Sequence, residues 1–260
     1  MSGGLIGYRN LYSMGGVWSM ADVVERIRQG LWPPYLNTIL VDSPVGVWLL
    51  NETSGTSAAD SSGNGNSGTY TGGYTLSQSG PTNIGPATLF NGSSGYVALG
   101  APSALNLTSA WHLEAWVYLT STPNGSGIIT EQQVSAGTSV LYELGFGQNG
   151  GGSTLGIGYI DTGGSWRLAT SSALSLNTWH LVGGEYDGTN LRLFVDGGQV
   201  ATSVPSAAPK TGLDAVFIGR RHGTDASPYF PGRIAAAAIY PSAIGLARHQ
   251  AHYNAINLFV

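Results

Sequence analysis

The chain has 260 residues, enough for one large β domain with a small appendage. Charged residues make up only 9% of it and the net charge is −4 with one lysine, which excludes the basic surface of a nucleic-acid-binding protein. Cysteine is absent, which excludes disulfides and thiolate metal sites, and no apolar run predicts a membrane span or a secretory leader.

Residues 1–16 are rich in glycine but carry several large apolar side chains, which is unusual for a flexible linker. We expect this arm to become ordered against a partner. The sequence therefore predicts a partner anchor over residues 1–36 and a β-sandwich over residues 37–260. The predicted anchor side chains are Tyr8, Tyr12, Trp18 and Trp32.

The stretch GVWSMADVVERIRQGLWPP predicts one short helix over about residues 19–29. Ser19 and Asp22 form a capping box, and Pro33 and Pro34 are expected to end the helix. Its flanking tryptophans either dock on the chain's own sandwich or insert into another subunit. Three turns of helix are not stable alone, so the helix must pack on something.

The remainder alternates strand and turn signals almost to its end. Strands are predicted over residues 45–51, 87–92, 95–100, 110–119, 126–132, 140–147, 154–161, 165–172, 178–187, 191–197, 215–221 and 232–240. Asparagine-glycine and aspartate-glycine pairs at 64–65, 91–92, 187–188 and 196–197 indicate hairpin turns. A closing helix is predicted over about residues 243–255, capped by Ser242.

About a dozen strands at hairpin spacing, without a repeat of 20 to 50 residues, predict an all-β fold. The expected architecture is a two-sheet antiparallel jelly-roll sandwich with a short helix near each end.

Six segments resemble a known family in their order along the chain. They are VGVWLLNETSGTSAADSSGNGNSGTYTG, ATLFNGSSGYVAL, WHLEAWVYLTS, LNTWHLVGGEYDGTNLRLFVDGGQVA, VFIGRRHG and YFPGRIAAAAIYPSAIGLARHQAHYNA. Over about residues 40–255 the chain is similar to the concanavalin A-like lectin/glucanase sandwiches of the laminin G-like group. The resemblance implies this fold and leaves the ligand open.

Members of this family often hold a structural calcium ion, which the resemblance places at Asp60, Asn64 and Asn66. Relatives carry two acids where this chain has Ala235 and Ala236, so an anchoring charge is missing. We expect no cofactor. Calcium remains the alternative to an Asx turn in which Asp60 binds its own backbone.

Glucanases of this fold use paired carboxylates on one strand. Glu185 and Asp187 are the candidates, but Asp187 belongs to a turn and Asn190 stands where a second glutamate is required. We therefore expect no enzymatic activity.

The histidines give little further indication of a catalytic or metal site. His112 and His180 each follow a tryptophan and are expected to be hydrogen-bonded framework residues. His249 and His252 are three residues apart, a spacing that can bind metal, but without a nearby acid we expect them on the surface of the last helix.

Charge is scarce along the chain and gathers in the segment GRRHGTDASPYF. Sugar sites combine an aromatic face with planar hydrogen-bonding groups, so this loop is the first candidate for a carbohydrate site. The arginine pair Arg220 and Arg221 can equally bind a neighbouring subunit. The candidate residues are Trp166, Arg220, Arg221, His222 and Tyr229.

The N-terminal stretch GVWSMADVVERIRQGLWPP also resembles a short element near the start of bacteriophage head and tail appendage proteins. That resemblance implies a non-enzymatic virion structural protein, present in many copies or as a homo-oligomer. It would contact other virion proteins through the arm and bind cell-surface glycans weakly. The alternatives are a free carbohydrate-binding lectin and a glycoside hydrolase.

Overall fold

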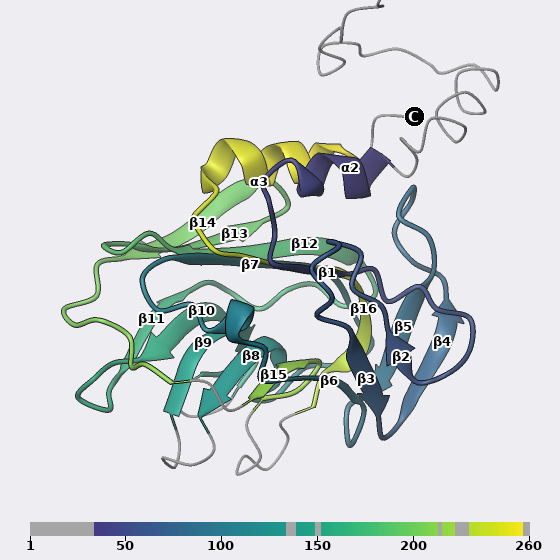
Figure 1. Cartoon of the computed structure of the whole chain (residues 1–260), viewed down its shortest axis with the longest axis horizontal. Coiled ribbons are helices and arrows are strands. Elements are labelled where there is room, and N and C mark those ends of the chain that lie inside the picture. Colours follow the sequence, from purple (N-terminus) through teal and green to yellow (C-terminus); the bar gives the residue numbers. More distant parts are fainter. Residues whose placement is uncertain (1–33, 134–138, 149–151, 213–214, 222–228, 257–260) are drawn as a thin grey trace, which may run out of the picture.

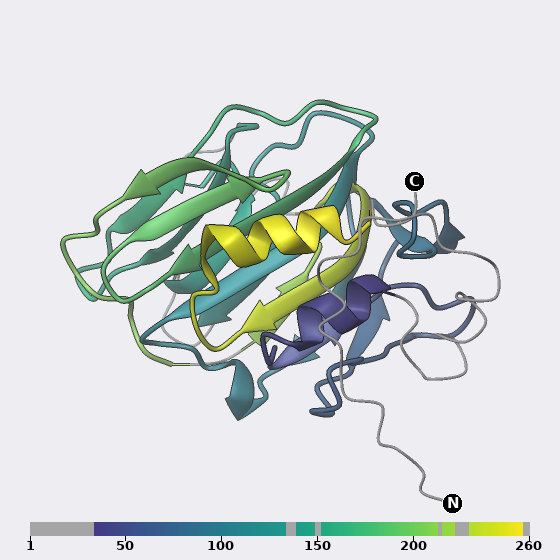
Figure 2. The ribbon, with the colours of Figure 1, turned by 90° about the horizontal axis from the view of Figure 1, so that it is seen from above.

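A computed structural model of the chain describes residues 34–133, 139–148, 152–212, 215–221 and 229–256. These residues form two antiparallel β-sheets packed face to face, with two helices lying over one of them (Figures 1 and 2). The predicted all-β, two-sheet antiparallel sandwich is confirmed.

The first sheet, sheet A, has a seven-strand path, and β1 (Gly46–Trp48) pairs with β16 beside it. The strands along the path are β14 (Gly198–Ser203), β13 (Leu191–Val195), β12 (Trp179–Tyr186), β7 (Trp111–Leu119), β16 (Pro231–Tyr240), β5 (Ala87–Asn91) and β4 (Tyr74–Gln78).

The second sheet, sheet B, lies on the side of sheet A away from the helices (Figure 1). Its strands, in spatial order, are β11 (Trp166–Thr170), β10 (Leu155–Ile160), β9 (Ser139–Phe146), β8 (Gly127–Gln133), β15 (Ala215–Ile218), β6 (Tyr96–Gly100), β3 (Gly68–Thr71) and β2 (Ser57–Ala58). A 3-10 turn, η2 (Ser103–Leu105), precedes β7.

Every predicted strand region contains an observed strand, but β2, β3, β4 and β14 were not predicted. The four are short and rich in Gly, Ser, Thr or Gln, and β14 has no buried residue. Short polar strands of this kind, three of which lie at sheet edges, lack the apolar alternation by which a strand is recognised.

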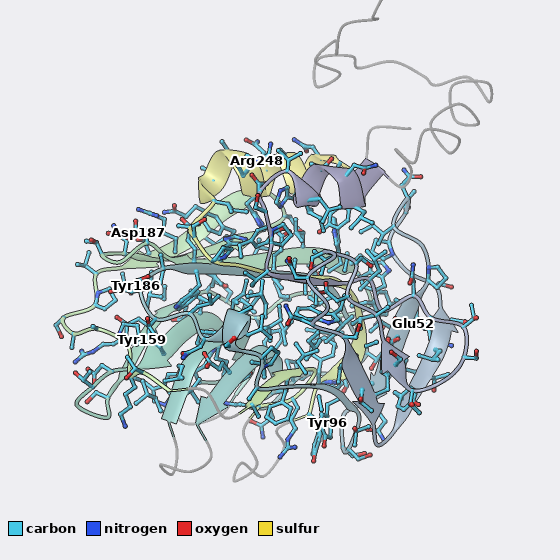
Figure 3. All side chains as sticks on the ribbon, viewed as in Figure 1. Glu52, Tyr96, Tyr159, Tyr186, Asp187 and Arg248 are labelled. Atoms are coloured by element: carbon cyan, nitrogen blue, oxygen red, sulfur yellow. The ribbon has the colours of Figure 1, made fainter. Side chains whose placement is uncertain are left out.

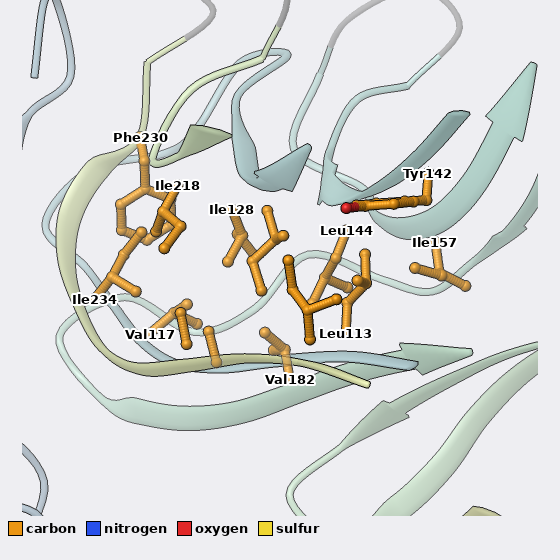
Figure 4. Close-up of a cluster of buried hydrophobic side chains, with 14 of the residues drawn as sticks. Leu113, Val117, Ile128, Tyr142, Leu144, Ile157, Val182, Ile218, Phe230 and Ile234 are labelled. Carbon is orange, nitrogen blue, oxygen red and sulfur yellow. The ribbon is translucent and has the colours of Figure 1, made fainter. Parts of the chain in front are cut away.

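Alternation along β7 builds the core between the sheets. Leu113, Ala115 and Val117 point inward, and Figure 4 shows Leu113 and Val117 among aliphatic side chains of both sheets. Burial of a leucine or valine side chain such as Leu113 or Val117 contributes about 1.5–3 kcal/mol by removing it from water. The intervening residues of β7 therefore face away from sheet B.

Two helices cover the outer face of sheet A and form a third layer (Figure 2). Helix α2 (Pro34–Leu40) places Tyr35 and Ile39 in a second apolar cluster, against Trp116 of β7. Pro34 begins this helix, because proline suits the first helical position. The predicted boundary at 36/37 thus falls inside α2, and the helix predicted over 19–29 lies outside the described residues.

The C-terminal helix is confirmed as α3 (Gly245–Asn254), but its predicted cap is wrong. Ile244 occupies the cap position, without a side-chain hydrogen bond. Instead, the Glu185 carboxylate accepts the backbone N–H groups of Ile244 and Gly245, at 3.1 and 2.9 Å. In the described part of the chain no helix is long and apolar enough to cross a membrane.

The expectation for His249 and His252 is also wrong. Both side chains are fully buried against sheet A, and His252 Nδ1 lies 3.0 Å from Glu114 Oε1. The acid partner is 138 positions away in sequence, so local reading could not find it. His180 is a framework residue as predicted, hydrogen-bonded to Ser175 Oγ and Asp196 Oδ2 at 2.7 Å each.

The predicted turns have two different roles. Asp196 and Gly197 have φ of 51° and 80° and form the hairpin between β13 and β14. Asn91 and Gly92 also form a turn, but it carries the chain from β5 of sheet A to β6 of sheet B. A turn signal therefore predicted the reversal without specifying the pairing.

One core position predicts a pH dependence of stability. Glu131 is paired in register with Val216 and Tyr142, which face the core, and neither of its carboxylate oxygens has a hydrogen-bond partner among the described residues. Burial raises the pKa of Glu131 to about 9. The folded state therefore holds a proton that the unfolded state releases above about pH 4.3, and stability falls as the pH rises from there to about 9.

The Glu131→Gln variant should remove this dependence. Its free energy of unfolding should match that of the parent near pH 4 and exceed it increasingly up to pH 9. Urea unfolding measured at several pH values checks this, with Glu52→Gln as the control at a non-core site. Parallel pH profiles for the parent and Glu131→Gln would contradict the assignment.

Candidate functional site

The outer face of sheet B brings aromatic side chains together beside a charged group. On β6 and β15, Val97 and Ile218 face the core, so Tyr96 and Phe217 point the other way. Their rings are 5.7 Å apart, edge to face. Figure 3 places Tyr96 on the opposite side of the molecule from Arg248 of α3.

Arg220 follows β15 and lies among three rings. Its guanidinium carbon is 4.9 Å from the ring centre of Phe217, 5.0 Å from that of Tyr96 and 5.7 Å from that of Tyr229. A β-bridge between Arg220 and Tyr229 fixes the two residues side by side. We call Arg220, Tyr96, Phe217 and Tyr229 the Arg220 cluster.

The Arg220 cluster has the chemistry of a sugar site. All four residues are partly exposed. Arg220 Nε is buried and has no hydrogen-bond partner among the described residues. Ring faces stack on the C–H side of a pyranose while guanidinium N–H groups donate to hydroxyl oxygens.

Arg221 is placed very differently, with a side chain only about 4% exposed. Its Nε donates to Glu143 Oε2 at 3.1 Å, its Nη1 donates to the carbonyl oxygen of Gly147 at 3.3 Å, and its guanidinium lies 5.3 Å from the Trp166 ring centre. This geometry suits a framework role that holds Trp166 at the edge of sheet B. Direct sugar contact by Arg221 and Trp166 stays a prediction, and His222 lies outside the described residues.

Sequence reasoning missed Tyr96 and Phe217. Both are strand residues that look like ordinary core positions when taken singly. The available signal was their alternation with Val97 and Ile218, which places them on the face away from the core. The predicted anchor residues Tyr8, Tyr12, Trp18 and Trp32 lie outside the described residues.

The residues predicted for calcium do lie together, in the loop between β2 and β3. Asp60 Oδ1 accepts the N–H groups of Val47 and Ser62 at 3.0 and 2.9 Å, and Oδ2 accepts that of Asn66 at 2.9 Å. Burial alone would raise the pKa of Asp60, but these donors outweigh it and lower the pKa.

The two asparagines of this loop present N–H groups to nearby carbonyls. Asn64 Nδ2 donates to the carbonyl oxygen of Pro44 at 3.0 Å, and Asn66 Nδ2 donates to that of Val45 at 2.7 Å. The backbone N–H groups around Asp60 therefore satisfy its carboxylate without a metal ion, as an Asx turn does. The expectation of no cofactor and the calcium alternative both stay predictions.

Glu185 and Asp187, the carboxylate pair considered for catalysis, both accept hydrogen bonds from groups of the framework. Besides the α3 backbone, Glu185 accepts Arg192 Nη1 at 2.9 Å, and its side chain is fully buried under α3. Asp187 accepts the turn N–H groups of Thr189 and Asn190 at 2.8 and 2.7 Å. Burial would raise the pKa of both acids, but His112 beside Glu185 and the turn N–H groups beside Asp187 lower each to about 2.

Comparison with known proteins gives a family match over most of the sandwich. Residues 91–247 match the Laminin_G_3 model, described as the concanavalin A-like lectin/glucanases superfamily. A search of curated protein sequences finds no match.

Solved structures with the same fold are distant in sequence. Domain 4 of AbnA, a GH43 extracellular arabinanase from Geobacillus stearothermophilus, in complex with arabinotriose, is 17% identical with a TM-score of 0.60, over 81% of this chain and 98% of that one. The binding domain of botulinum neurotoxin DC, in complex with SialylT, is 12% identical with a TM-score of 0.59, over 84% and 52%.

A sialidase from Trypanosoma rangeli in complex with 2,3-difluorosialic acid is 13% identical with a TM-score of 0.62, over 89% of this chain and 38% of that chain. The chain thus spans about half of the neurotoxin binding domain and just over a third of the sialidase. At these identities, the likenesses concern the fold.

Proposed function

Because the chain belongs to the concanavalin A-like lectin/glucanases superfamily, we propose that its sandwich binds glycans through the Arg220 cluster on the outer face of sheet B. The observation that carries the proposal is the guanidinium of the partly exposed Arg220 among three aromatic rings. A neutral, polyhydroxylated ligand fits this mixture of rings and N–H donors better than an anion, because three of the four side chains are aromatic.

Two structural relatives support glycans as the ligand class. The arabinanase domain is in complex with arabinotriose and the neurotoxin binding domain with SialylT. A surface formed by one guanidinium and three rings supports a weak single site, which many copies strengthen through avidity.

We propose that this binding is not accompanied by catalysis. The support is the placement of Glu185 and Asp187, which lie on sheet A rather than beside the Arg220 cluster. Both carboxylates are held by N–H donors and by Arg192, so neither is poised as a general acid near a sugar. Incubation with β-glucans and arabinan should release no reducing ends, and sustained release abolished by Glu185→Gln would contradict the proposal.

A direct test of the site compares two arginine variants on a glycan array that includes arabinotriose. Arg220→Gln should reduce binding about tenfold, because it removes a charged hydrogen-bond donor. Arg233→Gln is the matched control, since the Arg233 guanidinium also lies over a ring, that of Tyr118 on sheet A, at 4.8 Å. Equal binding by the parent and both variants would remove the Arg220 cluster as the site.

The proposed setting of this glycan binding is a bacteriophage virion, in which residues 1–36 anchor the chain and the sandwich projects outward. The support is the resemblance of the N-terminal stretch to phage appendage proteins and a surface poor in charge. Deletion of residues 1–33, which spares α2 and the buried Tyr35, should abolish incorporation into purified particles while leaving glycan binding intact. Incorporation of the truncated chain would contradict the anchor and favour a free lectin.

A further inference from the structure

A second group of functional side chains lies beneath α3, on the outer face of sheet A. His112 and Glu114 are two residues apart on β7 and so share one face, and His249 of α3 lies opposite them. All three are fully buried. One potential ligand atom from each lies within 4.8 Å of the others.

The spacing of these atoms approaches that of ligands around one ion. His112 Nε2 is 3.5 Å and His249 Nδ1 is 3.6 Å from the same atom, Glu114 Oε2. Metal–ligand bonds of about 2.0–2.1 Å in tetrahedral geometry separate neighbouring ligand atoms by roughly 3.3 Å. The ligand atoms of the group lie within 4.8 Å of one another, so the imidazoles would have to move together by up to about 1.5 Å to bind one ion.

The two imidazoles face carboxylates without forming hydrogen bonds to them. Both ring nitrogens of His112 and both of His249 are buried without a hydrogen bond to any described residue. Polar atoms buried in this way are costly unless something binds them. The fold nevertheless makes room for both rings, because a Cβ atom at Gly183 would lie 2.7 Å from His249 Nδ1 and 3.3 Å from His112 Cε1.

Neighbouring groups orient the potential ligands. Glu114 Oε1 accepts the Tyr240 hydroxyl at 2.7 Å, and His252 Nδ1 lies 3.0 Å from both carboxylate oxygens. Glu114 Oε2 also faces His112 and His249, so a metal ion would share this oxygen with His252. On the far side of the His112 ring, Nδ1 lies 3.4 Å from Glu185 Oε2. Metal-binding histidines usually donate their second N–H to a carboxylate, and Glu185 stands where it could accept one from His112.

We propose that His112, Glu114 and His249 bind one divalent transition-metal ion, preferentially zinc, which ties α3 to sheet A. Two imidazoles and one carboxylate suit zinc, and a water molecule would complete a tetrahedron. The site is structural and lies on the sheet opposite the Arg220 cluster. It therefore does not depend on glycan binding.

The test begins with metal content. The full chain, expressed with added zinc, should carry about one zinc ion per molecule by mass spectrometry. Removal of the ion by a chelator during unfolding, followed by refolding, should lower the melting temperature by about 5–10 °C, and refolding with zinc should restore it. Refolded protein with less than one-tenth of an ion per chain, at saturating zinc, would overturn the proposal.

Variants then assign the ligands. His249→Gln should lose the ion and the zinc-dependent rise in melting temperature, whereas His180→Gln, which changes a histidine bonded to Asp196, should keep both. Cobalt(II) should give the visible absorption bands of a tetrahedral site in the parent and not in His249→Gln.

Gly183→Ala serves if His249→Gln does not fold, because it keeps all three ligands and crowds the imidazoles. It should weaken cobalt binding at least tenfold. Unchanged metal content and cobalt spectra in every variant that folds would overturn the assignment.

Discussion

Truncation of Trp111 to alanine should lower the free energy of unfolding by about 3–5 kcal/mol. Trp111 begins β7, is fully buried between the sheets, and its ring lies 5.9 Å from that of Tyr142 of sheet B and 6.1 Å from that of Tyr186. The alanine variant would leave a cavity where the two sheets meet, and surrounding strands fixed by ladder hydrogen bonds can fill it only in part.

Chemical denaturation measured by circular dichroism checks this result. Val204→Ala is the control, since Val204 is 72% exposed and its truncation should change stability by less than about 0.5 kcal/mol. If Trp111→Ala does not yield folded protein, Trp111→Phe should show a smaller loss in the same direction. A change below about 1 kcal/mol for Trp111→Ala would mean that Trp111 is not part of the inter-sheet core.

Replacement of Arg221 by methionine should destabilise the domain by a similar amount, about 3–5 kcal/mol. The guanidinium is almost completely buried and neutralises the fully buried Glu143 carboxylate at 3.1 Å. Removing one member of a buried ion pair leaves the other charge in a poorly solvating environment, which is the main source of the loss.

A double-mutant cycle separates this framework role from ligand contact. Arg221→Met combined with Glu143→Leu should recover much of the lost stability, because apolar residues replace both charges. Folded Arg221→Met protein, measured at low temperature, should bind glycans like the parent. Normal stability with abolished glycan binding would instead place Arg221 at the ligand.

The sandwich could be predicted because its central strands alternate cleanly. On β7, Leu113, Ala115 and Val117 occupy every second position and face the core. By contrast, β4 and β14 lie at the ends of the sheet A path and carry few buried apolar side chains, so the sequence contained little to mark them.

The sites were only partly predictable, because their members come from distant parts of the chain. Arg220 and Tyr229 were found through the scarcity of charge elsewhere, and the bridge between them keeps them together. Tyr96 joins them through the pairing of β6 with β15, more than a hundred residues further along the chain. Local reading shows which side chains leave the core, whereas sheet order decides which of them meet.

The same limitation applied beneath α3. The His-Leu-Glu stretch of β7 places His112 and Glu114 on one face, and the three-residue spacing on α3 places His249 and His252 on another. Both pairs, the one on β7 and the one on α3, could be recognised in the sequence. Their approach depends on α3 folding back over sheet A, which no local pattern specified.

The central claim, glycan recognition on the outer face of sheet B, is tested most directly by a crystal structure of the chain with the strongest ligand from the array. The account predicts a sugar ring stacked on Tyr96, Phe217 or Tyr229, with a hydroxyl oxygen within hydrogen-bonding distance of the Arg220 guanidinium. A sugar bound on sheet A, or at the loop that holds Asp60, would contradict it.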